Sequence, residues 1–398
     1  DFKSNEYANL IAGSRYEPDE EAGLSHFLEH MLFKGASRRP TAREISEAIE
    51  SVGGSHNAAT DRELTVYYAK VPHTAAMETI DILADMIRAP IMDPAELEKE
   101  RSVILEELAS VEDSPGELAG ILIDETLWPG QPIGRNVGGS PDSVSSLPIS
   151  AVNAYLARQY VPENTVLAVA GNVNHEEVVA AAERWLGAVP KQAPGAWYPA
   201  TARNGTVRFA LRQKETEQAH ICLAYPSVSL SDPDRYAVDL LSTVLGEGMS
   251  SRLFLELREE RALVYDIHSY PSEFRDTGSF TIYAGCDPSN ARVTVEAVLE
   301  ETYGLLKGLP AAELRKEMAK GRIQLRMEDT RSVAGWIGSQ ELLLGRVQTV
   351  DEVVEQIEAV EYDQLMAVAK RILSPDQATM AIVGPFSDET EFTRALGV

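Results

Sequence analysis

The chain has 398 residues, of which 44% are hydrophobic and 25% are charged, and its formal net charge at pH 7 is −26. These proportions are typical of a globular protein, the length favours two domains over one, and the negative charge argues against nucleic acid or an anionic membrane surface as a partner. No run of eighteen apolar residues occurs and no secretory signal is visible at Asp1–Glu6, so we expect a cytoplasmic protein without a transmembrane helix.

The first chemically distinctive segment follows a predicted strand at Tyr7–Ala12 and reads His-Phe-Leu-Glu-His over residues 26–30. His26 and His30 are four residues apart, which places both imidazoles on one face of a helix, where they can bind a single zinc ion. Glu29 projects close to the same point, and a carboxylate there can take a proton from water activated by a metal. This is the inverted zincin order, H-x-x-E-H.

Two histidines with this spacing also occur on ordinary solvated helix faces, so a third ligand has to distinguish the two interpretations. A later helix is predicted at Pro94–Val111, with Asp93 as N-cap, Pro94 in the first position and Glu96 completing a capping box. Its predicted buried stripe is Leu97, Val103, Ile104 and Leu108.

This later helix carries the candidate third ligand. Glu100 and Glu107 are seven residues apart, which is two turns along one face, whereas the neighbouring Glu106 points elsewhere. A solvated charged helix remains the alternative for any one of these glutamates.

The runs HFLEHMLFKG and ERSVILEEL resemble the pitrilysin/insulysin family of zinc metallopeptidases, most closely its short-chain bacterial branch similar to mitochondrial processing peptidase. The resemblance covers nearly the whole chain. It implies that His26, His30 and Glu107 bind one zinc ion per chain and that Glu29 is the general base. It also implies that Glu100 supports the ligands without binding the zinc ion itself.

The chain also contains an internal duplication. Residues 162–171 and 375–384 both run from a Pro turn through an apolar strand to Gly, at a constant offset of 213, and each follows an amphipathic helix, Ser150–Tyr160 or Tyr362–Leu373. A fixed offset of about half the chain indicates two copies of one domain.

We therefore expect a zinc-binding domain at residues 1–190, a linker at 191–205 and a homologous second domain at 206–398 that lacks the zinc motif. Strands adjoin one another in pairs, which favours an α+β fold in which each domain has a mostly antiparallel sheet with helices on one face. The predicted strands are Leu64–Val71, Val207–Arg212, His220–Tyr225 and Gly278–Ala284, and the predicted helices include Thr41–Val52, His73–Arg88, Asp232–Leu245, Val293–Leu306 and the long stretch Ala311–Leu344.

One strand has no counterpart in the repeat. Tyr7–Ala12 corresponds to His220–Tyr225, and nothing upstream of it matches Val207–Arg212. The resemblance agrees, since family members usually carry about one more strand before this point. A truncated chain and an atypical beginning both fit this pattern. Cys222 and Cys286 are the two cysteines, and one bridge between them is compatible with the sequence.

The resemblance also assigns residues that contact substrate. In the family, an arginine and a tyrosine seven residues apart in the non-zinc domain reach the substrate, and Arg258 and Tyr265 match them. Arg258 would bind substrate oxygens and Tyr265 would stabilise the oxyanion; the alternative is an ordinary surface arginine and a half-buried strand tyrosine.

A short segment of the first half, Gly53–Thr60, also fits the family, where it forms an edge strand that pairs with an extended peptide. Asn57, Ala58 and Ala59 are the expected substrate-binding positions, because small residues let a peptide backbone approach. A simple turn into a core strand is the equal alternative.

Together these features predict a zinc endopeptidase or oligopeptidase that hydrolyses peptides bound in extended form between two domains or two subunits, with a homodimer implied by the resemblance. The competing interpretation is a non-catalytic peptide-binding or scaffolding subunit. Such relatives typically lose zinc ligands, and this chain keeps all of them.

Overall fold

The computed structural model describes residues 3–187, 191–201, 208–310 and 314–397, and these form two compact units that are each built on one β-sheet. Part of the predicted linker, residues 202–205, lies outside the described residues. The first unit comprises residues 1–109, 135–198 and 325–348, and the second comprises residues 110–134, 199–324 and 349–398.

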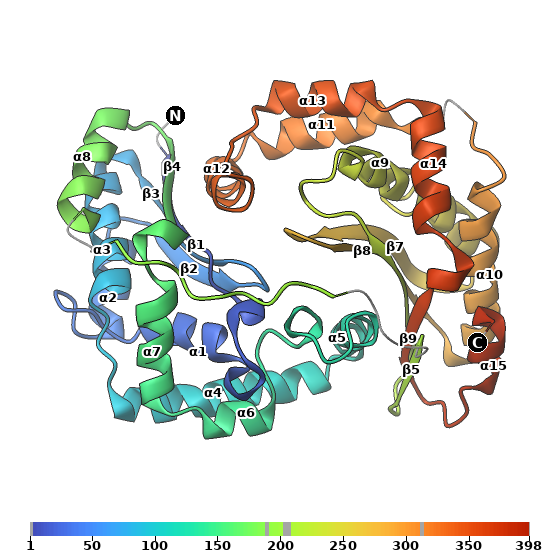
Figure 1. The fold of residues 1–398 in the computed structure, drawn as a ribbon, viewed down its shortest axis with the longest axis horizontal. Coiled ribbons are helices and arrows are strands. Elements are labelled where there is room, and N and C mark those ends of the chain that lie inside the picture. Colours follow the sequence, from blue (N-terminus) through green and yellow to red (C-terminus); the bar gives the residue numbers. More distant parts are fainter. Residues whose placement is uncertain (1–2, 188–190, 202–207, 311–313, 398) are drawn as a thin grey trace. The chain divides into compact units, whose positions relative to one another are not determined.

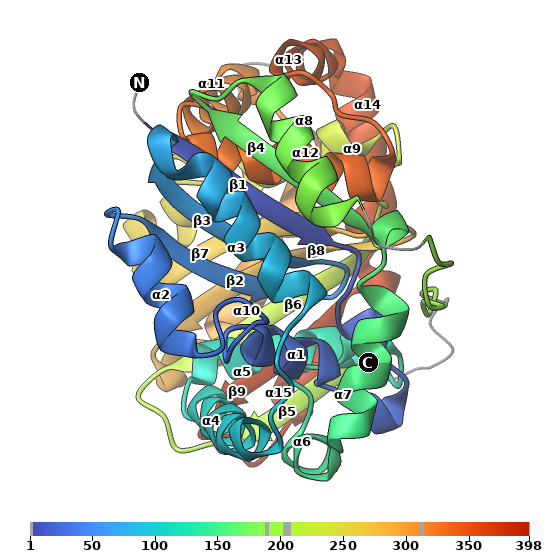
Figure 2. The same ribbon diagram turned by 90° about the vertical axis from the view of Figure 1, so that its left-hand side faces the viewer.

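The sheet of the first unit has four antiparallel strands in the order β2-β3-β1-β4 (Figure 2). Their bounds are Lys3–Leu10 for β1, Ser55–Thr60 for β2, Thr65–Pro72 for β3 and Thr165–Gly171 for β4. Because β2 pairs only with β3, it forms one edge of this sheet.

One face of this sheet carries the main core of the first unit. Tyr67, Ala69 and Val71 of β3 alternate with outward-pointing neighbours and pack, fully buried, with apolar residues of the covering helices. These helices are α1 (Leu24–Leu32), α2 (Ala42–Glu50), α3 (Ala76–Arg88), α4 (Pro94–Glu112), α6 (Pro141–Ser146) and α7 (Ile149–Gln159). Helix α8 (His175–Leu186) has no buried residue and contacts α3.

The opposite face of the same sheet is covered by a helix from far along the chain, α12 (Thr330–Leu344) (Figure 1). Val66 and Tyr68, which alternate with the core residues of β3, pack here against α12. The contacts include Ala334 of α12 and Ala168 and Ala170 of β4.

The sheet of the second unit has five strands in the order β5-β9-β6-β8-β7. All neighbours are antiparallel except β5 and β9, which are parallel. The bounds are Phe209–Gln213 for β5, Ala219–Ser227 for β6, Val264–Glu273 for β7, Gly278–Cys286 for β8 and Thr379–Gly384 for β9.

Helices also cover both faces of the second sheet. Cys222 and Ala224 of β6 pack against α5 (Pro115–Leu127), whereas Tyr225 points to the other face and contacts Tyr303 of α10. The remaining helices of this unit are α9 (Arg235–Leu245), α10 (Ala291–Leu305), α11 (Lys316–Arg326), α13 (Val350–Ala359), α14 (Tyr362–Ile372) and α15 (Thr390–Leu396), with a π-helical turn at Phe254–Glu260.

The structure confirms the duplication and the α+β class. Helix α14 begins 213 residues after α7, and β9 ends 213 residues after β4. Strand order agrees as well, since β2-β3-β1-β4 corresponds to β7-β8-β6-β9. Strand β5 is the additional strand of the second sheet, as the sequence predicted, and it has no equivalent among the described residues of the first.

Two details differ from the sequence-based expectations, and the structure also decides whether the two cysteines pair. The stretch Ala311–Leu344 is not one helix: α11 ends at Arg326 and α12 begins at Thr330, because Asp329 caps α12 by accepting a hydrogen bond from Arg331 N at 3.0 Å. Residues 311–313 of that stretch lie outside the described residues. Cys222 and Cys286 are both buried and free, so no bridge joins them. Helix α5 was not predicted.

Packing also divides the chain differently from its two contiguous halves. Residues 110–134, which carry α5, belong to the second unit, and residues 325–348, which carry α12, belong to the first. The domain boundaries at 190 and 206 therefore describe the repeat in the sequence, and each copy gives one helix to the other unit. Among the described residues, no helix combines the length and apolar character needed to cross a membrane.

Candidate metal centre

Helix α1 presents its polar residues on one side because its apolar residues follow helical spacing. Its buried apolar residues, spaced three and four apart, are Leu24, Phe27, Leu28, Met31 and Leu32. His26 and His30 therefore share the other face, partly exposed, with Glu29 between them in sequence and 9% exposed.

Helix α4 brings two glutamates to this face. Its buried residues are Leu97, Glu100, Ile104 and Leu108. The prediction that Val103 is buried is wrong, since 42% of it is exposed, and the polar Glu100 lies on the buried stripe because it is paired there.

The N-terminus of α4 also differs in part from the prediction. Asp93 accepts a hydrogen bond from Ala95 N at 2.8 Å, as a capping residue does. Glu96 does not close the predicted capping box, because its carboxylate instead pairs with Lys99 at 2.5 Å. The cap therefore rests on Asp93 alone.

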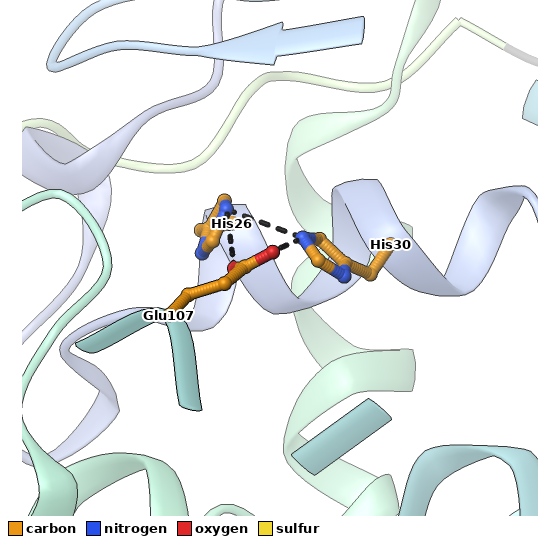
Figure 3. A group of neighbouring side chains, drawn as sticks. All are labelled: His26, His30 and Glu107. Atoms are coloured by element: carbon orange, nitrogen blue, oxygen red, sulfur yellow. Dashed lines mark hydrogen bonds and ion pairs between the residues drawn. The ribbon is translucent and has the colours of Figure 1, made fainter. Parts of the chain in front are cut away.

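Three of the predicted ligand atoms converge (Figure 3). The Nε2 atoms of His26 and His30 are 3.3 Å apart, and Oε2 of Glu107 lies 3.8 Å from the first and 3.6 Å from the second. No other group of metal-ligating side chains was found among the described residues. Glu106 is exposed and is not part of the group.

These separations fit a tetrahedral zinc ion. Ligand atoms about 2.0–2.2 Å from such an ion lie about 3.3–3.6 Å from one another. Two imidazole nitrogens and one carboxylate oxygen are also a donor set of catalytic zinc sites, which leave a fourth position open. The side chain of Glu107 is 48% exposed, so the group opens toward solvent.

Glu100 contacts the ring of His30 at Nδ1, the nitrogen that does not face the other candidate ligands. Its Oε2 lies 3.0 Å from Nδ1 of His30, and its Oε1 lies 2.5 Å from Nζ of Lys34. A carboxylate at Nδ1 fixes the orientation of the ring and leaves Nε2 free for a metal. Glu100 thus has the geometry expected for a residue that supports a ligand.

The surroundings of His26 favour its neutral form. Burial, together with the neighbouring His30, lowers the pKa of His26 to about 4. Neutral imidazole is the form that binds a metal. Nδ1 of His26 is buried and has no hydrogen-bond partner in the part of the chain that the structure describes.

Glu29 is held by a residue that the sequence did not suggest. Thr60, the last residue of β2, donates a hydrogen bond from its hydroxyl to Oε2 of Glu29. Burial raises the pKa of Glu29, and the Thr60 hydrogen bond opposes that change. A carboxylate with a raised pKa is a better proton acceptor near neutral pH.

The predicted substrate-binding residues lie on an edge strand of the first unit and on a helical turn and a strand of the second. Asn57, Ala58 and Ala59 are in the middle of the edge strand β2, with Asn57 and Ala59 exposed. Arg258 lies in the π-helical turn of the second unit, with its guanidinium carbon 4.9 Å from the ring centroid of Phe254, and Tyr265 on β7 is 56% exposed.

The sequence analysis did not identify two of the contacts at the centre, and only the first of them had a signal in the sequence. Lys34 lies two residues after the end of α1, so its closeness to His30 in the sequence already places it near the same partners. Thr60 is 31 residues from Glu29, and only the pairing of β2 with β3 brings the end of that strand to α1. No local pattern carries the second contact.

Comparisons with known proteins identify the family of this chain. A family model described as Insulinase (Peptidase family M16) matches residues 9–140, which include His26, His30 and Glu107. A second model, described as Peptidase M16 inactive domain, matches residues 146–320.

Curated relatives match over nearly the whole chain. A protein of Bacillus subtilis (strain 168) named uncharacterized zinc protease YmxG is 36% identical over 377 residues, which cover 94% of this chain and 91% of the relative. A protein of Streptomyces coelicolor, also named an uncharacterized zinc protease, is 38% identical over 387 residues, covering 95% and 84%.

Solved structures show the same fold. A protease from Helicobacter pylori superimposes with a TM-score of 0.91 at 22% identity, covering 97% of this chain and 95% of that one. A peptidase M16 inactive domain from Pseudomonas fluorescens gives a TM-score of 0.88 at 20% identity, covering 96% and 93%.

Proposed function

The chain belongs to the insulinase family, peptidase family M16, and we propose that within this family it is a zinc-dependent peptidase whose metal is held by His26, His30 and Glu107. The observation that carries the proposal is the convergence of two Nε2 atoms and one carboxylate oxygen, all within 4.8 Å of one another. The names of the relatives, which are called zinc proteases, support the choice of metal.

The residues of the chain supply the other parts of the reaction. Bound zinc provides Lewis acidity, which polarises a carbonyl and acidifies water. Glu29 accepts the proton of the attacking water as the water oxygen bonds to the peptide carbon, and it gives that proton to the leaving amine as the C–N bond breaks. The Thr60 hydroxyl holds the Glu29 carboxylate in place meanwhile.

Peptide in extended form is the proposed substrate. The free edge of β2, the strand that holds Asn57, Ala58 and Ala59, offers main-chain groups with which a peptide can pair once the hydrogen bond from Ala58 N to Asn57 Oδ1, at 2.8 Å, is released. Arg258 and Tyr265 are proposed to bind substrate oxygens, as the corresponding residues of the family do, and the exposure of the Tyr265 side chain supports this role. A homodimer in solution is part of the same proposal, and light scattering would test it.

A non-catalytic peptide-binding subunit is the alternative. It would need neither the convergent ligands nor a buried carboxylate beside them, and this chain has both. The peptidase is therefore the better-supported function.

Substitution of the proposed base tests the proposal. Glu29→Gln keeps the shape of the side chain and all three ligands, so we expect one zinc per chain by metal analysis and a loss of at least about a hundredfold in cleavage of an unbiased peptide library. Glu106→Gln, the same change at an exposed position of α4, is the matched control and should cleave normally. A Glu29→Gln variant that holds zinc and cleaves at the wild-type rate would rule out the mechanism.

A further inference from the structure

Helix α1 cannot cap its own N-terminus. Its N-cap residue is Gly23, which has a φ of 92° and no side chain to accept a hydrogen bond. A Cβ atom at this position would lie 2.5 Å from the carbonyl oxygen of Gly138. The residues that usually cap a helix, Ser, Thr, Asp and Asn, are therefore excluded here.

A carboxylate from an earlier segment takes over this role. Glu17 is fully buried; its Oε2 accepts a hydrogen bond from Gly23 N at 2.8 Å, and its Oε1 accepts one from Ser25 N at 2.6 Å. The first amides of a helix have no partners within the helix. A negative charge is also favoured at this end of a helix.

Further hydrogen bonds fix this segment against α1 and α7. Arg135 donates to the main-chain carbonyl oxygens of Glu17 at 2.6 Å and Ser14 at 3.0 Å. The hydroxyl groups of Ser25 and Tyr155 are 2.6 Å apart. Glu17 is therefore a fixed point for the start of α1, not a mobile side chain that happens to lie nearby.

The two histidines of the metal centre are held by different means. His30 is oriented by Glu100 at its Nδ1. His26 has no such acceptor among the described residues, and it is the third residue of α1, so it lies in the first turn. The position of its ring depends on the backbone of that turn, where Glu17 binds the amides.

We infer that Glu17 is a positioning residue, whose carboxylate fixes the first turn of α1 and thereby places His26 for zinc binding. This inference rests on the proposed function, because it takes His26 as a ligand. Burial raises the pKa of Glu17 to about 7, against the opposing effect of its hydrogen bonds with Ser25 and Gly23 and of the charge on Arg135. Keeping this carboxylate ionised in the interior therefore costs free energy.

Glu17→Gln in the full chain tests the inference at pH 8. Zinc affinity would be measured by competition with a chromophoric chelator, and amide hydrogen exchange would be measured on the metal-free chain. We expect zinc binding about tenfold weaker, the factor that corresponds to the loss of a helix cap, and faster exchange at the amides of Gly23 and Ser25.

Thr41→Ala provides a matched control. Thr41 caps α2 by accepting a hydrogen bond from Glu44 N at 3.2 Å, and α2 has nine residues, as α1 does. The loss of this cap should speed exchange at the start of α2 and leave zinc affinity unchanged. An equal loss of zinc affinity in the Thr41→Ala variant would show a general effect of stability and would overturn the inference.

Unchanged zinc affinity in the Glu17→Gln variant would overturn it as well. If that variant does not fold, Glu17→Asp keeps the charge and shortens the side chain by one methylene, and it should weaken zinc binding several-fold while speeding exchange at Ser25. Faster exchange with wild-type zinc affinity would then refute the inference. Failure of the proposed function is recognised separately, because the wild-type chain would not bind zinc.

Discussion

Glu100 and Glu107 lie on one helix, two turns apart, and their surroundings separate their roles. Glu100 is buried and contacts Nδ1 of His30 and the ammonium group of Lys34. Glu107 is half exposed and faces the two Nε2 atoms. A buried, paired carboxylate orients its neighbour, whereas an open one is free to bind a metal.

The adjacent glutamates of α4 provide a direct test of the ligand assignment. Glu107→Gln should weaken zinc binding by well over tenfold, because a charged ligand is lost, and Glu106→Gln should leave it nearly unchanged. Zinc titration of the two purified variants checks this. A larger loss in the Glu106→Gln variant would mean that the assigned face of α4 is wrong.

The buried carboxylate of Glu17 predicts a pH dependence of stability. Its pKa is about 7 in the folded protein against an ordinary value of 4.5, so between these pH values the folded state holds a proton that the unfolded chain releases. Stability from this group is therefore full below about pH 4.5 and is lost as the pH rises through about 7. The neighbouring hydroxyl of Tyr155 does not titrate in this window, because burial raises the pKa of Tyr155 well above 10.

Glu17→Gln should remove this dependence. The free energy of unfolding of the variant minus that of wild type should be larger at pH 8 than at pH 4.5, by up to roughly 3 kcal/mol. Urea unfolding of both proteins at the two pH values measures the change. An equal difference in the free energy of unfolding between the two proteins at both pH values would contradict the raised pKa of Glu17.

The convergence of the candidate ligands could be predicted from the sequence because it depends largely on local geometry. Spacings of four in α1 and seven in α4 place side chains on one helix face wherever the helix lies. Thr60 and Glu17 could not be predicted in this way, since each acts on α1 from another segment. Their roles exist only after the sheet and the loops have packed.

At the scale of elements, the second copy of the repeat carries other residues at the positions of the candidate ligands. Asp239, Ser242 and Thr243 of α9 lie 213 residues after His26, Glu29 and His30. Ser242 donates from its hydroxyl to the carbonyl oxygen of Ser269 on β7 at 3.0 Å. At this position the helix serves packing instead of metal binding, which agrees with the description of the second family model as an inactive domain.

The π-helical turn and strand β7 carry the proposed substrate contacts of the second unit. Tyr265→Phe or Arg258→Ala should lower peptide cleavage by about 10²–10³ if they stabilise the oxyanion or bind substrate oxygens. Zinc content should not change, because neither residue is a ligand.

Tyr270→Phe, the same change on the same strand, is the control for this pair and should cleave normally. Steady-state kinetics with one defined peptide, together with metal analysis, measures both effects. Wild-type kinetics in the Tyr265→Phe and Arg258→Ala variants would show that the two residues are ordinary surface side chains.

The elements themselves were predicted unevenly, for physical reasons. Strand Thr65–Pro72 and helix Ala76–Arg88 follow strong periodic patterns and lie close to their predicted bounds. Helix α5 has a continuous apolar character that favours no single period, and the break before α12 depends on the Asp329 cap inside a helical pattern. The sequence of a helix does not by itself determine which of the two sheets the helix covers.

At the scale of the whole molecule, each half of the chain supplies one helix to the unit that is built mainly from the other half. The first sheet needs α12, from residues 325–348, to cover Val66 and Tyr68, and the second needs α5, from residues 110–134, to cover Cys222 and Ala224. The first half of the chain, expressed alone, would therefore lack α12 and would carry α5 without the sheet that α5 covers. The second half would lack α5 and would carry α12 without its sheet.

Fragments of the chain test this arrangement. Residues 1–190 and residues 200–398, expressed separately, should fold poorly, because burial of apolar surface on one sheet face is lost in each. Co-expression should restore a soluble pair that binds zinc. Circular dichroism and zinc titration would follow both results, and a first fragment that is stably folded alone would contradict the need for α12.

The path of the chain has a consequence for breakage. It passes from one unit to the other five times, at residues 109–110, 134–135, 198–199, 324–325 and 348–349. A single cut by a protease after Tyr198 would leave two polypeptides. The first would contain α5, which belongs to the second unit, and the second would contain α12, which belongs to the first unit. Such a nicked protein would stay together until it is denatured, and the same topology would let a gene split at this point encode the protein as two chains.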